Sequence, residues 1–308
     1  MRNNKQKIII ICGPTASGKT GLALQLAKEL KTANILSVDS RQVYQDLDLI
    51  TGKDIPENLP PGIKIFGHDI FTPNERANLA DFVRYSQSLI KESRVLNTPL
   101  IIVGGTGLYL KALTQNLSDI SIPPDLLLRQ KLEKLSIEKL QELLQKENPK
   151  KLSSLNRSDF MNPRRLIRYL EISRSKANSS DINISTKNTS FYWVGLLPDK
   201  DTLKTSIYHR VLERIKQGAV AEVRALLKKY PDRSLAVYTS LGVPQIIAFL
   251  EGKLSQKQLI EVWTNAETDY SRRQIVWFKK QPGIVWYDKS TDRTLLVSQL
   301  KKIYQQNA

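Results

Sequence analysis

Sulfur and imidazole groups are scarce in this sequence. Of 308 residues one is a cysteine, Cys12, and two are histidines, His68 and His209. A single cysteine cannot form an internal disulfide or build a cysteine-rich zinc module. The two isolated histidines give no support for a metal pair or a histidine-based triad. We therefore expect the chemistry to depend on other side chains, with Cys12 as a small buried residue.

Long apolar runs are also missing. The apolar stretch within MRNNKQKIIIICG is about five residues long, whereas the apolar region of a signal peptide needs roughly 7–15. No segment approaches the ~18 apolar residues that a membrane span requires. We expect a cytoplasmic protein that does not associate with membranes.

Acidic residues are few relative to basic ones. The chain has 47 Lys and Arg against 30 Asp and Glu, a formal charge of +17. Residues 1–115 carry 14 basic and 10 acidic side chains, and residues 116–308 carry 33 and 20. Such a surplus can serve solubility alone, or it can bind a polyanion, most commonly nucleic acid.

Apolar runs are short and alternate with helical patterns. We predict strands at 8–12, 33–38 and 99–103, and helices at 19–31 and 79–94. Strands that are apolar throughout and alternate with helices indicate a parallel sheet covered on both faces. Ligands of such sheets gather at the carboxyl ends of the strands.

The middle of the chain differs from its flanks in sequence pattern. Charged helical patterns fill residues 117–190, ending in a polar low-complexity stretch predicted to be a mobile loop. A strand-like run, FYWVGLL, follows, and the remainder is mostly helical and basic. We predict a helical insertion at 117–190 within an α/β core formed by 1–116 and 191–308.

The segment GPTASGKT lies between a predicted strand and a predicted helix. Its spacing matches G-x-x-x-x-G-K-[ST], the phosphate-binding loop of P-loop proteins. Backbone N–H groups of such a loop surround phosphate oxygens, Lys19 supplies a cation, and the Thr20 hydroxyl can ligate Mg²⁺. The predicted phosphate-binding residues are Gly13, Pro14, Thr15, Ala16, Ser17, Gly18, Lys19 and Thr20. The fold class is thus predicted to be α/β, a P-loop NTPase-like parallel sheet flanked by helices.

Two further strand ends carry candidate chemistry. Asp39 follows the strand at 33–38 and can act as a base, hold Mg²⁺, or simply form an Asx turn. Thr106, in GGTG after the strand at 99–103, can present a hydroxyl to the same crevice or belong to a tight turn. That strand ends without the acidic residue typical of a Walker B strand, which disfavours a hydrolytic ATPase.

Basic clusters occur at two places outside the loop region. Arg164, Arg165 and Arg168 are spaced to share a helical face, and YSRRQIVWFKK at 270–280 alternates cations with aromatics. Both suit phosphate contacts beside stacking surfaces. Taken alone, each cluster is more typical of an amphipathic helix whose cations are solvated.

Taken together and in order, the motifs are more specific. GPTASGKT, VDSRQVYQDLD, HDIF, PLIIVGGTGLYLKAL, IPPDLLLRQKL, NPRRLIRYLEI and RRQIVWF resemble the tRNA dimethylallyltransferase family over nearly the whole chain. The resemblance implies a P-loop core with a helical insertion. It also implies transfer of a dimethylallyl group from its diphosphate to the exocyclic amine of the adenosine 3′ of a tRNA anticodon.

The resemblance assigns roles to individual residues. It implies that Asp39 accepts the proton of the amine, that Thr106 fixes the amine or the diphosphate, and that Mg²⁺ is held at Thr20. The residues that it implies contact tRNA are Asp39, Ser40, Arg41, Gln42, Arg129, Arg164, Arg165, Arg168, Arg272, Arg273, Gln274 and Trp277.

The sequence departs from the family pattern near its C-terminal part. The family usually has Thr-Arg where this chain has Glu267 and Thr268, and RVLERIKQGAVAEV lacks the family's acidic-x-Met element. The family arginine is expected near the diphosphate, so either the donor binds less well or another cation replaces it. Other readings remain: prenylation of free adenine nucleotide, a small-molecule P-loop kinase, or an RNA-binding descendant without activity. A monomer is the default expectation.

Overall fold

The computed structural model describes residues 6–56, 58–115, 118–175, 189–288 and 290–305. The chain divides into two compact units, one formed by residues 1–115 and 184–308 and the other by residues 116–183. Each unit is described separately below. Most of the low-complexity stretch that was predicted to be a loop lies outside the described residues.

The larger unit contains a six-stranded parallel sheet. Its strands are β1 (Gln6–Cys12), β2 (Ala33–Val38), β3 (Ile63–Phe66), β4 (Leu100–Gly104), β5 (Thr189–Leu196) and β6 (Ile284–Tyr287). The strand order is β3-β2-β4-β1-β5-β6, and every neighbouring pair is parallel. The predicted α/β fold class is confirmed. Strand β3 was not predicted, because among its four residues only Ile63 is buried and no continuous apolar run marks it.

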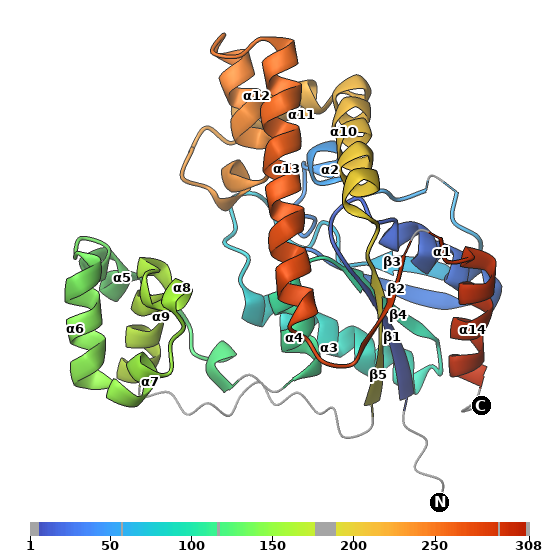
Figure 1. The fold of residues 1–308 in the computed structure, drawn as a ribbon, viewed down its shortest axis with the longest axis horizontal. Helices are drawn as coiled ribbons and strands as arrows, with labels where there is room; N and C mark the ends of the chain where they lie inside the picture. Colours follow the sequence, from blue (N-terminus) through green and yellow to red (C-terminus); the bar gives the residue numbers. More distant parts are fainter. Residues whose placement is uncertain (1–5, 57, 116–117, 176–188, 289, 306–308) are drawn as a thin grey trace, which may run out of the picture. The chain divides into compact units, whose positions relative to one another are not determined.

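The described part of this unit contains nine α-helices, some beside the sheet and others beyond the carboxyl ends of its strands (Figure 1). They are α1 (Lys19–Leu30), α2 (Asp48–Thr51), α3 (Leu79–Val95), α4 (Gly107–Thr114), α10 (Lys200–Gln217), α11 (Ala219–Lys229), α12 (Val243–Leu250), α13 (Gln256–Lys279) and α14 (Arg293–Gln305). Several of these helices begin at a residue whose side chain caps the first turn. Asn78 caps α3 by accepting from the N–H of Asp81, and Ser255 forms a capping box with Gln258 at the start of α13.

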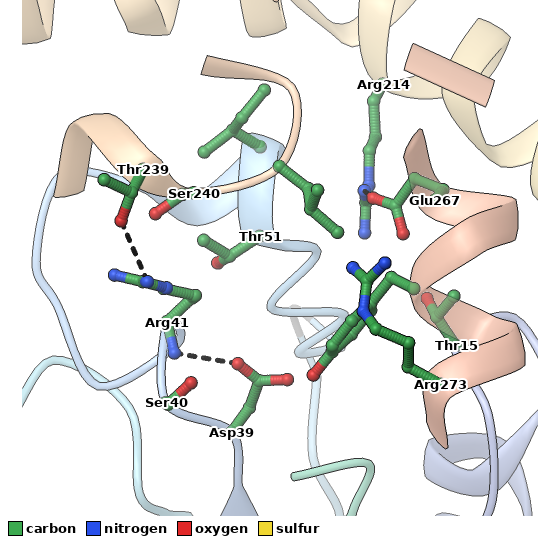
Figure 2. A pocket seen from close by; sticks show the side chains of 13 residues that line it. Thr15, Asp39, Ser40, Arg41, Thr51, Arg214, Thr239, Ser240, Glu267 and Arg273 are labelled. Carbon is green, nitrogen blue, oxygen red and sulfur yellow. Dashed lines mark hydrogen bonds and ion pairs between the residues drawn. The ribbon is translucent and has the colours of Figure 1, made fainter. Parts of the chain in front are cut away.

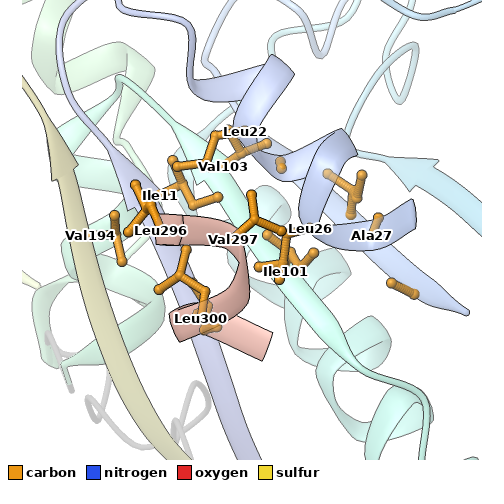
Figure 3. Close-up of a cluster of buried hydrophobic side chains, with 14 of the residues drawn as sticks. Ile11, Leu22, Leu26, Ala27, Ile101, Val103, Val194, Leu296, Val297 and Leu300 are labelled. Atoms are coloured by element: carbon orange, nitrogen blue, oxygen red, sulfur yellow. The ribbon is translucent and has the colours of Figure 1, made fainter. Parts of the chain in front are cut away.

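One face of the sheet packs against α1 and α14 (Figure 3). Ile9 and Ile11 of β1 point to this face, because alternate residues of a strand share a side. They meet Leu22 of α1 and Leu296 of α14, and all four side chains are buried. This packing joins the end of the chain to the helix that follows the phosphate-binding loop.

Helix α13 is the longest helix among the described residues, with 24 residues. It packs against α10 and α12 and continues to α4, where the ring of Trp277 lies directly against Gly107. Figure 1 shows α10 and α13 rising beyond the carboxyl ends of the strands. Within the described ranges, no helix combines the length and the apolar character that crossing a bilayer requires.

The smaller unit is helical. Its helices are α5 (Leu126–Leu132), α6 (Ile137–Glu147), α7 (Pro149–Ser153), α8 (Arg157–Phe160) and α9 (Pro163–Arg174). Each begins at an Asp, Ser or Asn whose side chain accepts a backbone N–H, a strong helix-start signal. Leu140, Leu144, Leu166 and Leu170 are fully buried between α6 and α9. The unit thus has a hydrophobic core of its own.

Candidate active site

The predicted phosphate-binding and catalytic residues lie in loops that follow three adjacent strands. β2, β4 and β1 are neighbours at the centre of the sheet, so the loops after their carboxyl ends lie next to one another. The loop after β1 is GPTASGKT, the loop after β2 begins at Asp39, and the loop after β4 contains Thr106. Gly104 ends β4 because a Cβ there would collide with the Val38 carbonyl of β2. The strand therefore cannot carry a Walker B acid at that position.

The phosphate-binding loop has the expected backbone. Ala16 and Gly18 have φ values of 58° and 84°, in the left-handed region that turns the loop on itself. Gly18 is also the N-cap of α1, and no side chain caps this helix. The first N–H groups of α1 are thus available to an anion, which the helix dipole also favours.

Lys19 sits inside this loop. Its ammonium group donates to the Pro14 carbonyl and, at 3.5 Å, to Ser17 Oγ. Burial, together with the nearby positive charge of Arg210, lowers the pKa of Lys19 to about 8. An incoming anion would stabilise the charged form, so phosphate binding and protonation of Lys19 are coupled.

Asp39 is oriented by its own loop. Its Oδ1 accepts the backbone N–H of Arg41 at 2.8 Å and that of Gln42 at 3.4 Å. The turn that was considered as an alternative therefore exists, but it uses only one carboxylate oxygen. Figure 2 shows the other oxygen turned toward the middle of a pocket. A single carboxylate here can both shape the loop and face a ligand.

Thr106 and Tyr270 lie beside this carboxylate. Thr106 Oγ1 accepts the backbone N–H of Ser40 at 3.4 Å, which ties the β4 loop to the β2 loop. Burial, together with the negative charge of Asp39, raises the pKa of the Tyr270 hydroxyl. The phenol therefore remains protonated and able to donate.

A pocket of about 280 Å³, here called the carboxylate pocket, opens in front of Asp39 (Figure 2). Its wall residues are Thr15, Asp39, Ser40, Arg41, Ile50, Thr51, Arg214, Thr239, Ser240, Leu241, Glu267, Tyr270 and Arg273. The wall combines apolar surface from Ile50 and Leu241 with charged groups. It suits a ligand with both apolar and polar parts.

A second pocket of about 70 Å³, the loop pocket, adjoins it. Lys19, Thr20, Gly105, Arg210 and Gln274 are among its wall residues. It shares four wall residues with the carboxylate pocket, which are Thr15, Asp39, Thr51 and Tyr270. The carboxylate and the phosphate-binding loop thus face one continuous set of cavities.

The loop pocket offers oxygen ligands. The side chains of Thr20 and Asp39 both line it, and hydroxyl and carboxylate oxygens are the ligands that Mg²⁺ prefers. The described residues contain no group of three or more His, Cys, Asp or Glu arranged for a metal. Mg²⁺ usually binds through one or two protein oxygens plus substrate phosphates, so the residues present fit this ion better than a metal held by protein alone.

Gln274 ties the loops together from α13. Its Oε1 accepts the backbone N–H of Thr15 at 2.8 Å, and its amide nitrogen donates to the Gly105 carbonyl at 3.0 Å. The side chain is buried, with 6% exposed. The sequence suggested contact with tRNA, but in this structure both ends of the amide are bound to backbone.

Replacing Gln274 with leucine should therefore loosen the phosphate-binding loop. The variant leaves a partly buried N–H and a buried carbonyl without partners, which we expect to cost about 2 kcal/mol of unfolding free energy. Denaturant unfolding measures this loss, and Gln256→Leu at the exposed start of α13 is the control. Equal stability of the two variants would contradict the assigned role.

The other predicted RNA contacts fall into two groups. Some are already bound within the protein: Arg41 donates to the Ala236 carbonyl at 2.8 Å and to Thr239 Oγ1 at 2.9 Å, and Gln42 donates to the Gly52 carbonyl at 2.8 Å. In the smaller unit, Arg129 and Arg168 both pair with the buried Glu171.

The second group is more accessible. Arg164, Arg165 and Arg272 are exposed, and Arg165 pairs with Asp159. The guanidinium of Arg273 lies over the Tyr270 ring, 5.7 Å from its centroid, at the edge of the carboxylate pocket. Trp277 is half-buried against α4. All of these RNA contacts stay predictions.

Two charged wall residues were not singled out from the sequence, Arg210 and Arg214 of α10. Arg210 reaches from α10 to within 3.4 Å of Thr15 Oγ1 and pairs with Asp54 at 2.8 Å. The spacing of Arg210 and Arg214, four residues apart on one helical face, was the available signal.

Comparisons with known proteins identify the family of this chain. A family model described as IPP transferase matches residues 42–281. The tRNA dimethylallyltransferase of Synechocystis sp. is 34% identical over 292 residues, covering 94% of this chain and 93% of the relative. That of Anoxybacillus flavithermus is 32% identical, covering 97% of this chain and 95% of the relative.

Solved structures show the same fold. The full-length tRNA isopentenylpyrophosphate transferase of Bacillus halodurans matches with a TM-score of 0.71 and 27% identity, covering 98% of this chain and 97% of that one. A eukaryotic dimethylallyltransferase acting on tRNA matches in fold with a TM-score of 0.80 at 22% identity, covering 98% of this chain and 80% of that one. Because the family model spans most of the chain and curated relatives align over nearly its full length, this protein belongs to the IPP transferase family.

Proposed function

We propose that this protein transfers a dimethylallyl group from dimethylallyl diphosphate to the N6 amine of the adenosine 3′ of the anticodon in tRNA, giving N6-dimethylallyladenosine. The observation that carries the proposal is the shared set of cavities, in which the Asp39 carboxylate and the phosphate-binding loop face the same space. Curated relatives of similar length carry the name tRNA dimethylallyltransferase.

The protein has a group to stabilise the charge on the leaving diphosphate and another to accept the proton of the adenine amine. The C–O bond of the donor breaks and its electron pair leaves with the diphosphate, whose new charge meets the N–H groups of α1 and the Lys19 ammonium. The adenine nitrogen forms the new bond to carbon, and the proton that it loses passes to Asp39. The phosphates bound by the loop are thus those of the leaving group, and no ATP is consumed.

We propose that Mg²⁺ assists the same step. The Thr20 hydroxyl in the loop pocket would hold the ion together with oxygens of the donor. When bound, the ion would neutralise part of the charge that develops on the diphosphate.

The acceptor must leave its stack to react. An adenine within the anticodon loop reaches the Asp39 carboxylate only after it flips out, at a cost of a few kcal/mol. Exposed cations such as Arg164 and Arg272 would hold the RNA through phosphate contacts. Free adenine nucleotide has no need of such surfaces, which favours tRNA as the acceptor.

One assay tests the proposal against its alternatives. The protein is incubated with Mg²⁺, dimethylallyl diphosphate and either unmodified tRNA or adenosine monophosphate, and prenylated adenosine is sought by mass spectrometry. Product on tRNA alone is expected. Product on the nucleotide alone would indicate an adenylate prenyltransferase. Consumption of added ATP without prenylation would indicate a kinase, and tRNA binding without turnover would indicate an RNA-binding protein that has lost its activity.

The proposal also predicts how tRNA binding responds to salt. Each phosphate contact that is removed should reduce the slope of log K against log [salt] by about one unit. We expect this for Arg272→Gln and for Arg273→Gln. Arg84→Gln is the matched control, since Arg84 and Arg272 are 58% and 63% exposed and each forms an i, i+3 ion pair. Unchanged slopes in both test variants would show that neither arginine contacts RNA.

A further inference from the structure

Helix α2 is a single turn of four residues at the wall of the candidate active site. Its Ile50 and Thr51 line the carboxylate pocket, and Thr51 also lines the loop pocket. One helical turn is unstable by itself, because its few hydrogen bonds do not offset the conformational entropy that its formation costs. The residue before it, Leu47, has no side-chain acceptor to cap it. The position of this wall must therefore be fixed by other parts of the chain.

A carboxylate from a distant helix caps α2. The Glu222 side chain of α11 accepts the first three N–H groups of the turn: Oε1 accepts those of Asp48 at 2.7 Å and Leu49 at 2.8 Å, and Oε2 accepts that of Ile50 at 2.8 Å. Such N–H groups have no partner within a helix, and the helix dipole favours a negative charge beside them. A capping side chain usually comes from the residue just before the helix, whereas Glu222 lies 172 residues beyond Ile50.

The other end of α2 is held by Gln42. Its amide nitrogen donates to the Thr51 carbonyl at 3.2 Å and to the Gly52 carbonyl at 2.8 Å. Its Oε1 accepts the hydroxyl of Ser37 at 2.7 Å and lies 3.2 Å from Nε2 of His68. The amide is thereby fixed in one orientation. Both ends of the turn are thus bound by side chains that lie outside it.

Ile50 has little room to move away from the pocket. The residue is 1% exposed, and a Cβ at Gly242 would collide both with Cδ1 of Ile50 and with the ring of Trp263. Among the described residues that line the carboxylate pocket, Ile50 and Leu241 are the aliphatic ones. An apolar group of a ligand in this pocket therefore has Ile50 as one of its few apolar contacts.

Building on the proposed function, we infer that Glu222 is a positioning residue for the donor. By capping α2, it holds Ile50 against the five-carbon group of dimethylallyl diphosphate, while the phosphate-binding loop holds the diphosphate. Glu222 is not among the described residues that line either pocket, so it acts through the turn that it caps. Affinity for the apolar half of the donor then depends on Glu222, and affinity for the diphosphate half does not.

A purely structural cap is the competing explanation, and two ligands of equal charge separate the two. Dimethylallyl diphosphate carries the apolar group, and methyl diphosphate lacks most of it. With no tRNA present, no transfer occurs and binding can be measured by calorimetry. In Glu222→Ala the dissociation constant of dimethylallyl diphosphate should rise about 10-fold, the effect of losing much of one apolar side-chain contact, while that of methyl diphosphate stays within about 2-fold of the wild type.

Glu222→Gln is a second variant that keeps most of the cap. It retains the oxygen that binds the first two N–H groups and loses the acceptor for Ile50. We expect the same selective loss of donor affinity, but smaller, at about 3-fold. Glu213→Ala is the control, because Glu213 is an exposed glutamate of the neighbouring helix α10 that accepts from Gln217 and is likewise absent from the described walls of both pockets. Its affinities for both ligands should match those of the wild type.

Equal weakening of both ligands in Glu222→Ala would show that Glu222 supports the fold in general, and unchanged affinities would show that the wall does not need this cap. Either result would refute the inference. A wild type that binds dimethylallyl diphosphate no more tightly than methyl diphosphate would also refute it, since the wall would then contact no apolar group. These measurements need no turnover, so a wild type with the expected affinities that leaves tRNA unmodified refutes the proposed function and not this inference.

Discussion

Asp39→Asn should lower the rate of tRNA prenylation by about 10²- to 10⁴-fold, the usual contribution of a general base. The amide can still accept the backbone N–H groups of Arg41 and Gln42, so the turn after β2 should persist. What the variant loses is the capacity to take a proton from the adenine amine. Single-turnover assays with saturating tRNA and donor measure the rate of the chemical step directly.

The binding of tRNA should be nearly unaffected by this change. Asp46→Asn is the matched control. Asp46 belongs to the same loop and accepts hydrogen bonds from Lys229 and Tyr230, but it lines neither of the two pockets described above. The control should retain the wild-type rate. A parallel loss of tRNA affinity and rate in Asp39→Asn would contradict the role of Asp39 as a base and indicate a structural role instead.

Lys19→Met is expected to lower kcat/KM for dimethylallyl diphosphate by about 10²- to 10³-fold. The ammonium group is surrounded by the loop and donates to the Pro14 carbonyl. The substitution removes the positive charge that stabilises the negative charge developing on the leaving diphosphate. This loss should raise the activation barrier by roughly 3–4 kcal/mol. Initial-rate kinetics at varied donor concentration measure it.

The pH dependence of the wild type gives a second readout of the same residue. Because the pKa of Lys19 in the free protein is lowered to about 8, the cationic form is lost as the pH rises through that value. Donor affinity should therefore be constant below about pH 7 and decline above about pH 8. In Lys19→Met the decline should vanish, leaving a uniformly low affinity. A wild-type profile that stays flat to pH 9.5 would contradict this account of Lys19.

The sequence predicted those parts of the site that lie at strand ends. The segment GPTASGKT, Asp39 and Thr106 each directly follow a continuous apolar run, and in a parallel sheet such positions share one edge. Neighbouring strands then bring them together without any long-range packing. The family resemblance indicated the reaction and the roles of individual residues. The comparisons confirmed the family and the fold.

The helical half of the site was not predictable in the same way. Arg214 and Glu267 meet only because α10 packs on α13, and a basic helical sequence does not show which face will contact which partner. Arg129 has a partner that the sequence does not show. A cation that looks available to RNA in the sequence is held by the buried Glu171 in the folded unit, and only the tertiary structure shows it.

The central claim is that one set of cavities places a departing diphosphate beside a carboxylate that receives the adenine proton. A crystal structure with inorganic diphosphate and an unmodified anticodon stem-loop tests it most directly. We predict diphosphate oxygens on backbone N–H groups of the phosphate-binding loop and of the first turn of α1, and a flipped adenine whose N6 lies within hydrogen-bonding distance of Asp39. An adenine that remains stacked in its loop, or that binds away from Asp39 while the diphosphate occupies the loop, would contradict the account.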